Sequence, residues 1–270
     1  YSYDLISDGK YLYNTDDNNN IVRYSINKKG VLGINKTCSY TKTVIDHFKD
    51  ITNDSSYMIE SSSPVYYNGK IYLAITYFLT PELSNSFYMK ENALLTFDVS
   101  TCKYSIKDID GVDLSNQTIA FYNKEMYLIG GYDYSTDSLS DAVYKYSNSK
   151  WQKVSSLSEK RAMGKCLQYG NKLVYTMGIN EGGTCPNNLI FDGTKWTKSN
   201  KNLGINKYTP YEINNKMLSY YSCGVDFVEN GILYTGELFD NKGDTVLYNP
   251  SNDTFTVMNN YFHIDSVNGI

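Results

Sequence analysis

The sequence is poor in the residues on which most catalytic and metal sites depend. Its 270 residues include two arginines, Arg23 and Arg161, and two histidines, His47 and His263. A sialidase-type site, which holds a substrate carboxylate with three arginines, is therefore excluded. The five cysteines show no CxxC pattern and no zinc-ligand spacing. Because their number is odd, at least one thiol stays unpaired within the chain, although the count leaves room for one bridge.

Long apolar runs and a strong net charge are also missing. No run of about 18 apolar residues occurs, so we expect no membrane span. The formal net charge is −4, which argues against a nucleic-acid partner because phosphate binding requires a basic surface. No G-x-S-x-G, H-E-x-x-H, Walker or dinucleotide motif is present, and we expect no cofactor. The chain begins at Tyr1 rather than Met, which favours a piece excised from a larger protein with other domains.

Tyrosine, in contrast, is abundant at 28 residues, and asparagine is frequent. Tyrosine suits strands and asparagine suits turns, although an AT-rich genome would produce the same bias. Residues 121–151 predict four short strands in a row with no helix between them. Tight turns join antiparallel neighbours, so this stretch predicts an antiparallel meander. One meander cannot bury both of its faces, and it must stack on copies of itself.

Five degenerate copies of this unit are present. The first hairpin recurs, around a Gly or Asn turn, at residues 4–14, 65–75, 120–130, 167–178 and 226–236. In the second half of each unit a large residue follows an aromatic one across a short turn: Tyr24 with Val31, Phe97 with Tyr104, Tyr146 with Trp151, Phe191 with Trp196, and Tyr248 with Phe255. Successive units lie roughly 45 to 73 residues apart, around the period of about 50 that is typical of kelch repeats.

This organisation resembles the kelch-repeat β-propeller family, with no specific member indicated. Gly130-Gly131 with Tyr144-x6-Trp151 is the best local match, while the first two units depart most from the pattern. The resemblance covers nearly the whole chain. It implies an all-β fold, a kelch-like β-propeller of four-stranded antiparallel blades in a single domain over residues 1–270. Five units are complete, and residues 261–270 look like one further inner strand, so five or six blades are expected.

Such a propeller has two unlike faces. The turns from strand one to two and from strand three to four lie on one face, and all of them are short. The long connections, at residues 38–62, 77–92, 132–141, 179–187 and 198–221, fall on the other face, which we call the long-loop face. The apolar spacing of Val44, Ile45, Phe48 and Ile51 predicts a short helix in the first of them. The second is also expected to be partly helical.

Candidate binding residues on the long-loop face are Tyr57, Glu60, Tyr88, Tyr132, Asp133, Tyr134 and Arg161. Tyr-rich loops bury contact area at low entropic cost, which suits a protein or glycan partner. In kelch domains that bind acidic peptides, an Arg at the position of Arg161 lines the central pocket. The alternative is an Arg that bonds neighbouring loop carbonyls. The sequence thus favours an interaction module over an enzyme.

A propeller enzyme, of copper radical oxidase or sugar epimerase/mutarotase type, is the alternative function. Copper radical oxidases on kelch propellers use two His, two Tyr and a Cys–Tyr crosslink, and His47 and His263 both fall on long-loop segments. The D-G-x-x-W run at 192–196 faintly resembles a sialidase Asp-box, but it also fits a tight turn before a packed Trp.

For the core, we expect burial of the second strands, with Tyr72, Tyr127, Val174 and Leu233 among the buried residues. Trp151 and Trp196 should each pack at the start of an outer strand.

Overall fold

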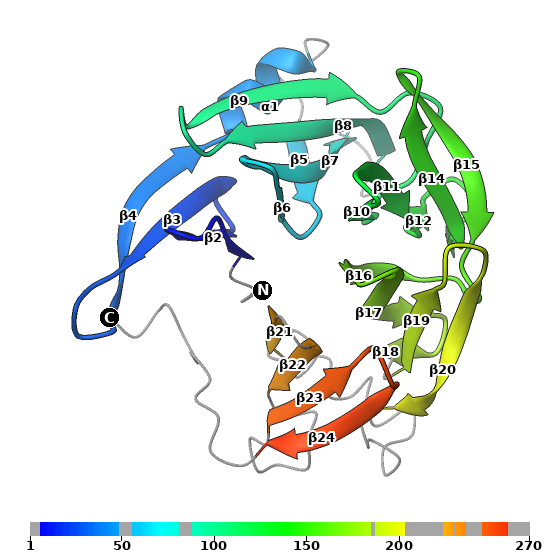
Figure 1. Ribbon diagram of the computed structural model, residues 1–270. Coiled ribbons are helices and arrows are strands. Elements are labelled where there is room, and N and C mark those ends of the chain that lie inside the picture. Colours follow the sequence, from blue (N-terminus) through cyan, green and yellow to red (C-terminus); the bar gives the residue numbers. More distant parts are fainter. Residues whose placement is uncertain are drawn as a thin grey trace.

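The computed structural model describes residues 6–48, 56–80, 88–184, 187–202, 224–228, 231–235 and 245–258. These residues form five antiparallel sheets, each with a main path of four strands, arranged around a common centre as the blades of a propeller (Figure 1). The predicted all-β, kelch-like propeller fold is confirmed, with five blades. The additional strand expected at 261–270 lies outside the described residues.

Each blade is built from consecutive strands. Blade 1 contains β1 (Ile6–Ser7), β2 (Leu12–Thr15), β3 (Asn20–Ile26) and β4 (Leu32–Ser39), and α1 (Thr41–His47) follows it. Blade 2 contains β5 (Ser56–Ser61), β6 (Val65–Tyr67), β7 (Lys70–Thr80), β8 (Tyr88–Asp98) and β9 (Lys103–Asp108). Blade 3 contains β10 (Thr118–Tyr122), β11 (Glu125–Ile129), β14 (Ala142–Ser147) and β15 (Lys150–Ser156), with the small hairpin β12 (Tyr132–Asp133) and β13 (Ser138–Leu139) between its second and third strands. Blade 4 contains β16 (Ala162–Tyr169), β17 (Lys172–Asn180), β18 (Gly183–Thr184), β19 (Asn187–Phe191) and β20 (Trp196–Asn202). Blade 5 contains β21 (Gly224–Val228), β22 (Gly231–Thr235), β23 (Thr245–Asn249) and β24 (Thr254–Met258).

The tight turns explain why strands follow one another so closely. Asn68-Gly69 joins β6 to β7, and Asn123-Lys124 joins β10 to β11; all four residues have positive φ. Two successive positive φ angles define the hairpin turn whose twist matches that of the flanking strands, and Asn and Gly adopt it most readily. The hairpins predicted from these turn dipeptides are present.

Four of the five predicted aromatic pairs lie directly opposite one another on adjacent strands. They are Phe97–Tyr104, Tyr146–Trp151, Phe191–Trp196 and Tyr248–Phe255. The prediction for the first unit was wrong, because Tyr24 lies opposite Ile34 rather than Val31. The pair that closes the turn is Ile26 with Leu32, so Val31 belongs to the turn before β4.

Apolar clusters between neighbouring blades form the core. Tyr13 and Ile21 of blade 1 pack with Leu73 and Phe97 of blade 2. Similar clusters join blade 2 to blade 3 and blade 3 to blade 4. Since a blade exposes two faces, each cluster buries one face of each of two sheets, which is why the repeats stabilise one another.

Burial of the second strands agrees with the prediction at the described positions. Tyr127 and Val174 are buried. Tyr72 is half-buried, and its ring lies 5.0 Å from that of Phe121 in the next blade. The side chain of Leu233 lies outside the described residues.

The Gly130-Gly131 pair allows two chain segments to cross at the end of β11. Both residues have positive φ, and a Cβ on Gly130 would collide with the main-chain oxygen of Arg161. A Cβ on Gly131 would lie 2.7 Å from the oxygen of Ser115. The amide of Gly131 instead donates to the Arg161 oxygen at 2.8 Å. Glycine is required here because the entries to blades 3 and 4 both pass against it.

The long connections only partly match their predicted form. The predicted helix is present as α1, with Val44 and Phe48 buried; Ile51 lies outside the described residues. Residues 81–87 of the insertion at 77–92, where a part-helical form is expected, lie outside the described residues; on either side of them β7 continues to Thr80 and β8 begins at Tyr88. Their cross-strand pairing satisfies the backbone polar groups that an irregular loop would leave open.

Both tryptophans pack at the start of an outer strand, as predicted, but they differ in burial. Trp196 is buried and stacks on Phe191 with ring centroids 5.2 Å apart, whereas Trp151 is half-buried and tilts over Tyr146 at 5.1 Å. Before Trp196, the Asp192 carboxylate accepts the amides of Thr194 and Lys195. Residues 192–196 therefore form the tight turn that was the alternative to an Asp-box.

We predict that Trp196→Ala lowers the free energy of unfolding by roughly 3–5 kcal/mol, because it empties a large buried site between blades. Trp151→Ala should cost less, about 1–2 kcal/mol, since that ring is partly hydrated in the native state. Urea denaturation of both variants measures the difference. Equal losses, or a larger loss for Trp151→Ala, would contradict this assignment.

Candidate functional site

On the long-loop face, blade 2 has unusually long strands and blade 3 has an additional hairpin. Strands β7 and β8 each have 11 residues, whereas β11, the second strand of blade 3, has 5. The additional length of β7 leads toward its connection with β8, on the long-loop face. The corresponding connection of blade 3 carries the β12–β13 hairpin. Neighbouring blades thus present ordered strands where the sequence predicted loops.

Three aromatic side chains connect these two hairpins, and we call Phe78, Tyr132 and Tyr134 the blade 2–3 aromatic cluster. The rings of Phe78 and Tyr134 lie edge to face with centroids 5.0 Å apart, and those of Tyr134 and Tyr132 lie 4.7 Å apart. Phe78 is buried, while Tyr134 is 38% exposed. The Tyr132 hydroxyl donates to the Asp137 carboxylate across the hairpin. The cluster therefore presents one exposed ring on a fixed base.

Glu60 of β5 lies next to this cluster. Burial raises the pKa of its carboxyl, and a hydrogen bond with Asn116 opposes that shift only in part. One carboxyl oxygen, Oε2, is buried and has no hydrogen-bond partner among the described residues. Burial also raises the pKa of Tyr134, and the nearby charge of Glu60 raises it further. The site thus contains an acid group whose charge is poorly compensated.

Asn116, at the entry to blade 3, contacts both blade 2 and blade 4. Its side chain bonds Glu60 of blade 2, and its main-chain oxygen accepts the amide of Met163 in blade 4 at 3.1 Å. The preceding Ser115 exchanges two main-chain hydrogen bonds with Tyr132, of 2.9 and 2.7 Å. The entry to blade 3 therefore holds Glu60 and the aromatic cluster in one place.

Tyr57 forms a second aromatic contact, on the other side of β5. It is 42% exposed, and it stacks on Tyr77 with ring centroids 5.8 Å apart. Tyr77 in turn packs on Phe48, which follows α1, at 5.1 Å. Tyr57 and Glu60 are three residues apart on one strand, so their side chains point to opposite faces of the sheet.

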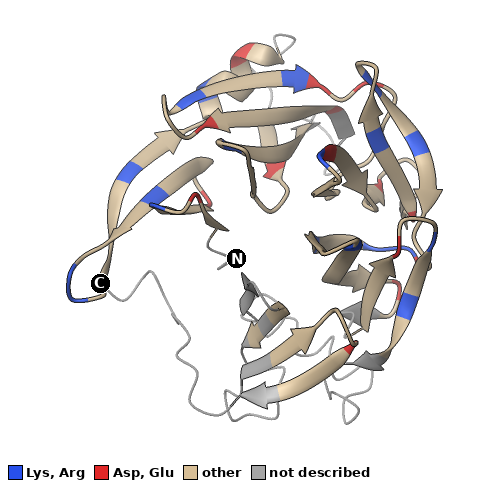
Figure 2. Ribbon diagram, viewed as in Figure 1, with Lys and Arg blue, Asp and Glu red and all other residues tan. Residues whose placement is uncertain are grey.

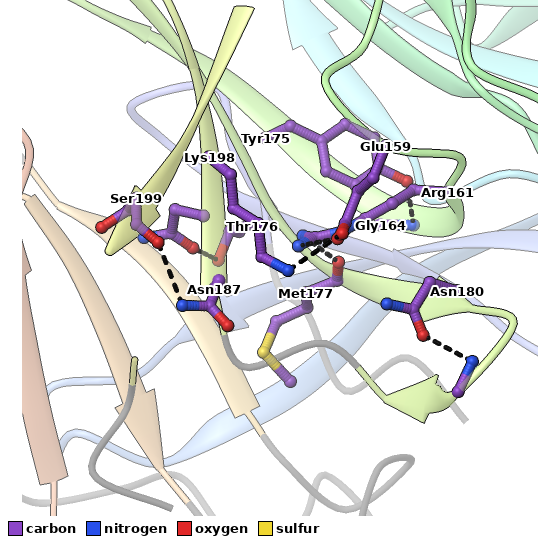
Figure 3. Close-up of polar contacts among 12 residues, drawn as sticks. Glu159, Arg161, Gly164, Tyr175, Thr176, Met177, Asn180, Asn187, Lys198 and Ser199 are labelled. Atoms are coloured by element: carbon purple, nitrogen blue, oxygen red, sulfur yellow. Dashed lines mark hydrogen bonds and ion pairs between the residues drawn. The ribbon is translucent and has the colours of Figure 1, made fainter. Parts of the chain in front are cut away.

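Arg161 is not on the surface, which corrects its predicted placement. It is 0% exposed and lies between the end of blade 3 and the first strands of blade 4 (Figure 3). Its Nη2 lies 2.6 Å from Oε1 of Glu159, and its Nη1 donates to the main-chain oxygen of Met177 at 3.2 Å. The alternative interpretation, an arginine that bonds loop carbonyls, describes its contacts better than a ligand-facing role.

The Glu159 carboxylate pairs with two cations, Arg161 and Lys198. Lys198 of β20 approaches its second oxygen, Oε2, at 3.0 Å (Figure 3). Burial would raise the pKa of Glu159, but the positive charges of Arg161 and Lys198 outweigh burial and lower it. This carboxylate is therefore compensated, in contrast to that of Glu60.

The remaining predicted residues have other surroundings. Tyr88 begins β8 opposite Leu79, and its side chain lies outside the described residues. The Asp133 carboxylate accepts both the amide and the hydroxyl of Ser135, and hydrogen bonds from Ser135 lower the pKa of Asp133. Asp133 thus shapes the turn between β12 and β13.

The sequence patterns do not point to Phe78, Tyr77 or Asn116 as site residues. The first two fell in a segment interpreted as an insertion. The alternation of buried residues Ile71, Leu73 and Ile75 continues to Tyr77, and it is the signal that could have extended the strand. Asn116 carries no local signal, since its contacts come from residues distant in sequence.

Figure 2 shows most Lys and Arg positions spread along the outer strands and turns of the blades.

His47 Nε2 lies 2.5 Å from Oδ1 of Asp108, while His263 lies outside the described residues. Within the part of the chain that the structure describes, no three His, Cys, Asp or Glu residues gather as a metal site would require. In the same part, no helix is long and apolar enough to cross a bilayer.

Comparisons with known proteins agree with the propeller. No family model matches the chain. Kelch-like protein 41b of Danio rerio is 27% identical over 108 residues, which cover 39% of this chain and 18% of that protein. The solved structure of YjhT aligns with a TM-score of 0.52 at 16% identity, over 93% of this chain and 84% of that one. The predicted kelch-repeat resemblance is confirmed, with no particular member indicated.

We predict that Glu60→Gln raises the melting temperature at pH 7. The folded protein raises the pKa of Glu60, so it holds this proton more tightly than the unfolded chain does. The resulting stability is complete below the ordinary pKa of 4.5 and is lost as pH rises through the folded value. The advantage of Gln should therefore shrink at about pH 4, as thermal unfolding at both pH values can measure.

The exposed Glu91 of β8 provides the control, because Glu91→Gln should change the melting temperature little at either pH. A lower melting temperature of Glu60→Gln at pH 7 would mean that the carboxylate is stabilised by contacts that offset its burial.

We also predict that Arg161→Met lowers the free energy of unfolding by roughly 3 kcal/mol, since it removes the partner of a poorly hydrated carboxylate. The double variant Arg161→Met/Glu159→Gln should lose less, because the one charge it leaves without its partner, that of Lys198, is 47% exposed to water. Urea denaturation at pH 7 compares them. Unchanged stability in the single variant would contradict a structural role for the ion pair.

Proposed function

We propose that this kelch-like propeller is a protein-interaction module and that it binds its partner through the long-loop face of blades 2 and 3. The kelch-like fold supports an interaction role in general. The finer assignment rests on the side chains of this chain, because a fold by itself does not choose a function.

The observation that carries the proposal is the pair of exposed tyrosines, each supported by a buried ring. Tyr57 stacks on Tyr77, and Tyr134 packs on Phe78. A tyrosine held in this way loses little conformational entropy when a partner covers it, and it still offers a hydroxyl for hydrogen bonding. Residues of this kind dominate the energy of protein interfaces.

The surroundings of the two tyrosines suit a partner of ordinary size. A typical interface buries about 800 Å² on each side. The β12–β13 hairpin, the ends of β7 and β8 and helix α1 provide contiguous chain segments around them. In this arrangement Arg161 acts indirectly, because its main-chain oxygen holds the amide of Gly131 just before β12.

A glycan carried by the partner is the second candidate ligand, since exposed tyrosine rings also stack on sugars. Removal of glycans from the partner separates the two cases. Unchanged binding after deglycosylation supports protein contacts, and lost binding supports glycan recognition.

To test the surface, we predict that Tyr57→Ala/Tyr134→Ala weakens binding about tenfold or more, because it removes both aromatic anchors. Proteins captured from a lysate on the wild-type chain are identified by mass spectrometry. Each is then purified, and its Kd for the wild-type and variant chains is measured by calorimetry.

The matched control is Ile26→Ala/Val31→Ala, at the short turn between β3 and β4 on the opposite face. These side chains are 57% and 41% exposed, so the control also removes exposed apolar groups. The control should keep its Kd within about twofold of the wild type. If only the control variant loses affinity, the partner binds the opposite face and the proposal is wrong.

A further inference from the structure

Two cysteines distant in sequence meet between blades 1 and 2. Cys38 belongs to β4, the outer strand of blade 1, and Cys102 ends the turn that joins β8 to β9 in blade 2. Both are half-buried and free. They pack against the same apolar cluster, which joins the two blades. The pKa of the Cys38 thiol is raised, mainly by burial and also by its interaction with Cys102.

The neighbours of Cys102 fix the direction of its side chain. Arg23, on β3 of blade 1, donates from Nη1 to the sulfur of Cys102 at 3.7 Å. The Arg23 guanidinium is itself held by Asn35 at 2.7 Å and lies over the ring of Tyr11 at 4.5 Å. The sulfur of Cys102 therefore points toward blade 1, where Cys38 is located.

The neighbours of Cys38 hold its main chain in the same way. Tyr104 of β9 donates its hydroxyl to the main-chain oxygen of Cys38 at 2.6 Å. Tyr104 also packs edge to face on Tyr40, just after β4, with ring centroids 6.0 Å apart. Blade 2 thus holds the segment that carries Cys38 beside the strand that follows Cys102.

We propose that Cys38 and Cys102 are a redox pair, in which a low-molecular-weight disulfide such as oxidised glutathione converts the two thiols into a bond between blades. One protein thiolate attacks glutathione disulfide, forming a mixed disulfide and releasing a glutathione thiolate. The second protein thiolate attacks the protein-side sulfur of the mixed disulfide, forms the Cys38–Cys102 bond and releases the other glutathione as a thiolate. Two electrons pass to glutathione, and the two protons from the protein thiols end on two molecules of reduced glutathione.

Accessibility separates this pair from the other described cysteine. Cys166 is buried in the cluster between blades 3 and 4, and burial raises its pKa well above the ordinary value. Exchange requires a thiolate that the attacking disulfide can reach. The thiols of Cys38 and Cys102 are half-buried and can be reached, whereas the thiol of Cys166 is buried.

The bond would close a loop from residue 38 to residue 102. This loop contains α1, β5, β6, β7 and β8, and it carries Tyr57 and Phe78. Oxidation would therefore fasten the outer strand of blade 1 to blade 2 and restrain the unfolded chain over a long segment. This inference does not depend on the proposed partner surface, since it concerns the reactivity of the chain alone.

The test treats the native protein with excess oxidised glutathione at about pH 8, where thiolates form. Remaining thiols are blocked with N-ethylmaleimide, and a non-reducing digest is analysed by mass spectrometry. We expect a peptide pair linked through Cys38 and Cys102, with Cys166 reduced. The melting temperature should rise by roughly 5–15 °C, and dithiothreitol should reverse the rise.

Two kinds of variant complete the experiment. Cys38→Ser and Cys102→Ser should each retain a single glutathione on the remaining thiol and show no rise in melting temperature. Cys166→Ala should still form the bridge and show the same rise from its own starting value. The inference is overturned if Cys38 and Cys102 stay reduced, carry separate glutathiones or link to other cysteines, or if the bridge forms without raising the melting temperature.

Discussion

Apolar contact between neighbouring blades is the constraint on which this structure depends. A four-stranded antiparallel sheet has two faces, and a blade can bury them only against the blades beside it. The clusters between blades 1 and 2, 2 and 3, and 3 and 4 consist largely of aliphatic and aromatic residues of the first three strands of each blade. Between blades 4 and 5 polar contacts take part as well: Tyr169 donates to the Gly231 oxygen at 2.5 Å, and Thr176 bonds Tyr234.

Local chemistry made much of the fold predictable from the sequence. Turn dipeptides such as Asn68-Gly69 require positive φ, so they mark hairpins wherever they stand between alternating residues. The prediction failed where a feature depends on pairing over a longer range. Strands β3 and β4 pair from Ile26 with Leu32 onward, so Tyr24 faces Ile34, and pairing between β7 and β8 makes strand of the described part of a predicted insertion. The pairing of Tyr24 has no local signal, whereas the length of β7 has one in the alternation of buried residues that continues to Tyr77.

The candidate site was less predictable than the fold, because its members come together only when blades pack. Sequence placed Tyr134 and Glu60 on one face, but it could not bring Phe78 or Asn116 to them. It also gave Arg161 a surface position. The ion-pair partner of Arg161, Glu159, is only two positions away, but Arg161 is internal in a structure where Gly131 lets blade 3 approach the Arg161 main chain. Burial of this kind is a property of the assembled ring.

The two carboxyls of this region show where the chain departs from the rule that buried charge is paired. Glu159 has Arg161 and Lys198 beside it, and its pKa is lowered despite burial. Glu60 has Asn116 alone as a hydrogen-bond partner among the described residues, and its pKa is raised. Natural sequences keep such conflicts mainly where function requires them, since elsewhere they only reduce stability. The uncompensated carboxyl lies against Tyr134, the exposed ring of the blade 2–3 aromatic cluster, and not against the ion pair that joins blades 3 and 4. The energetic conflict and the exposed aromatic surface therefore coincide, which is the physical argument for the proposal that blades 2 and 3 carry the binding surface.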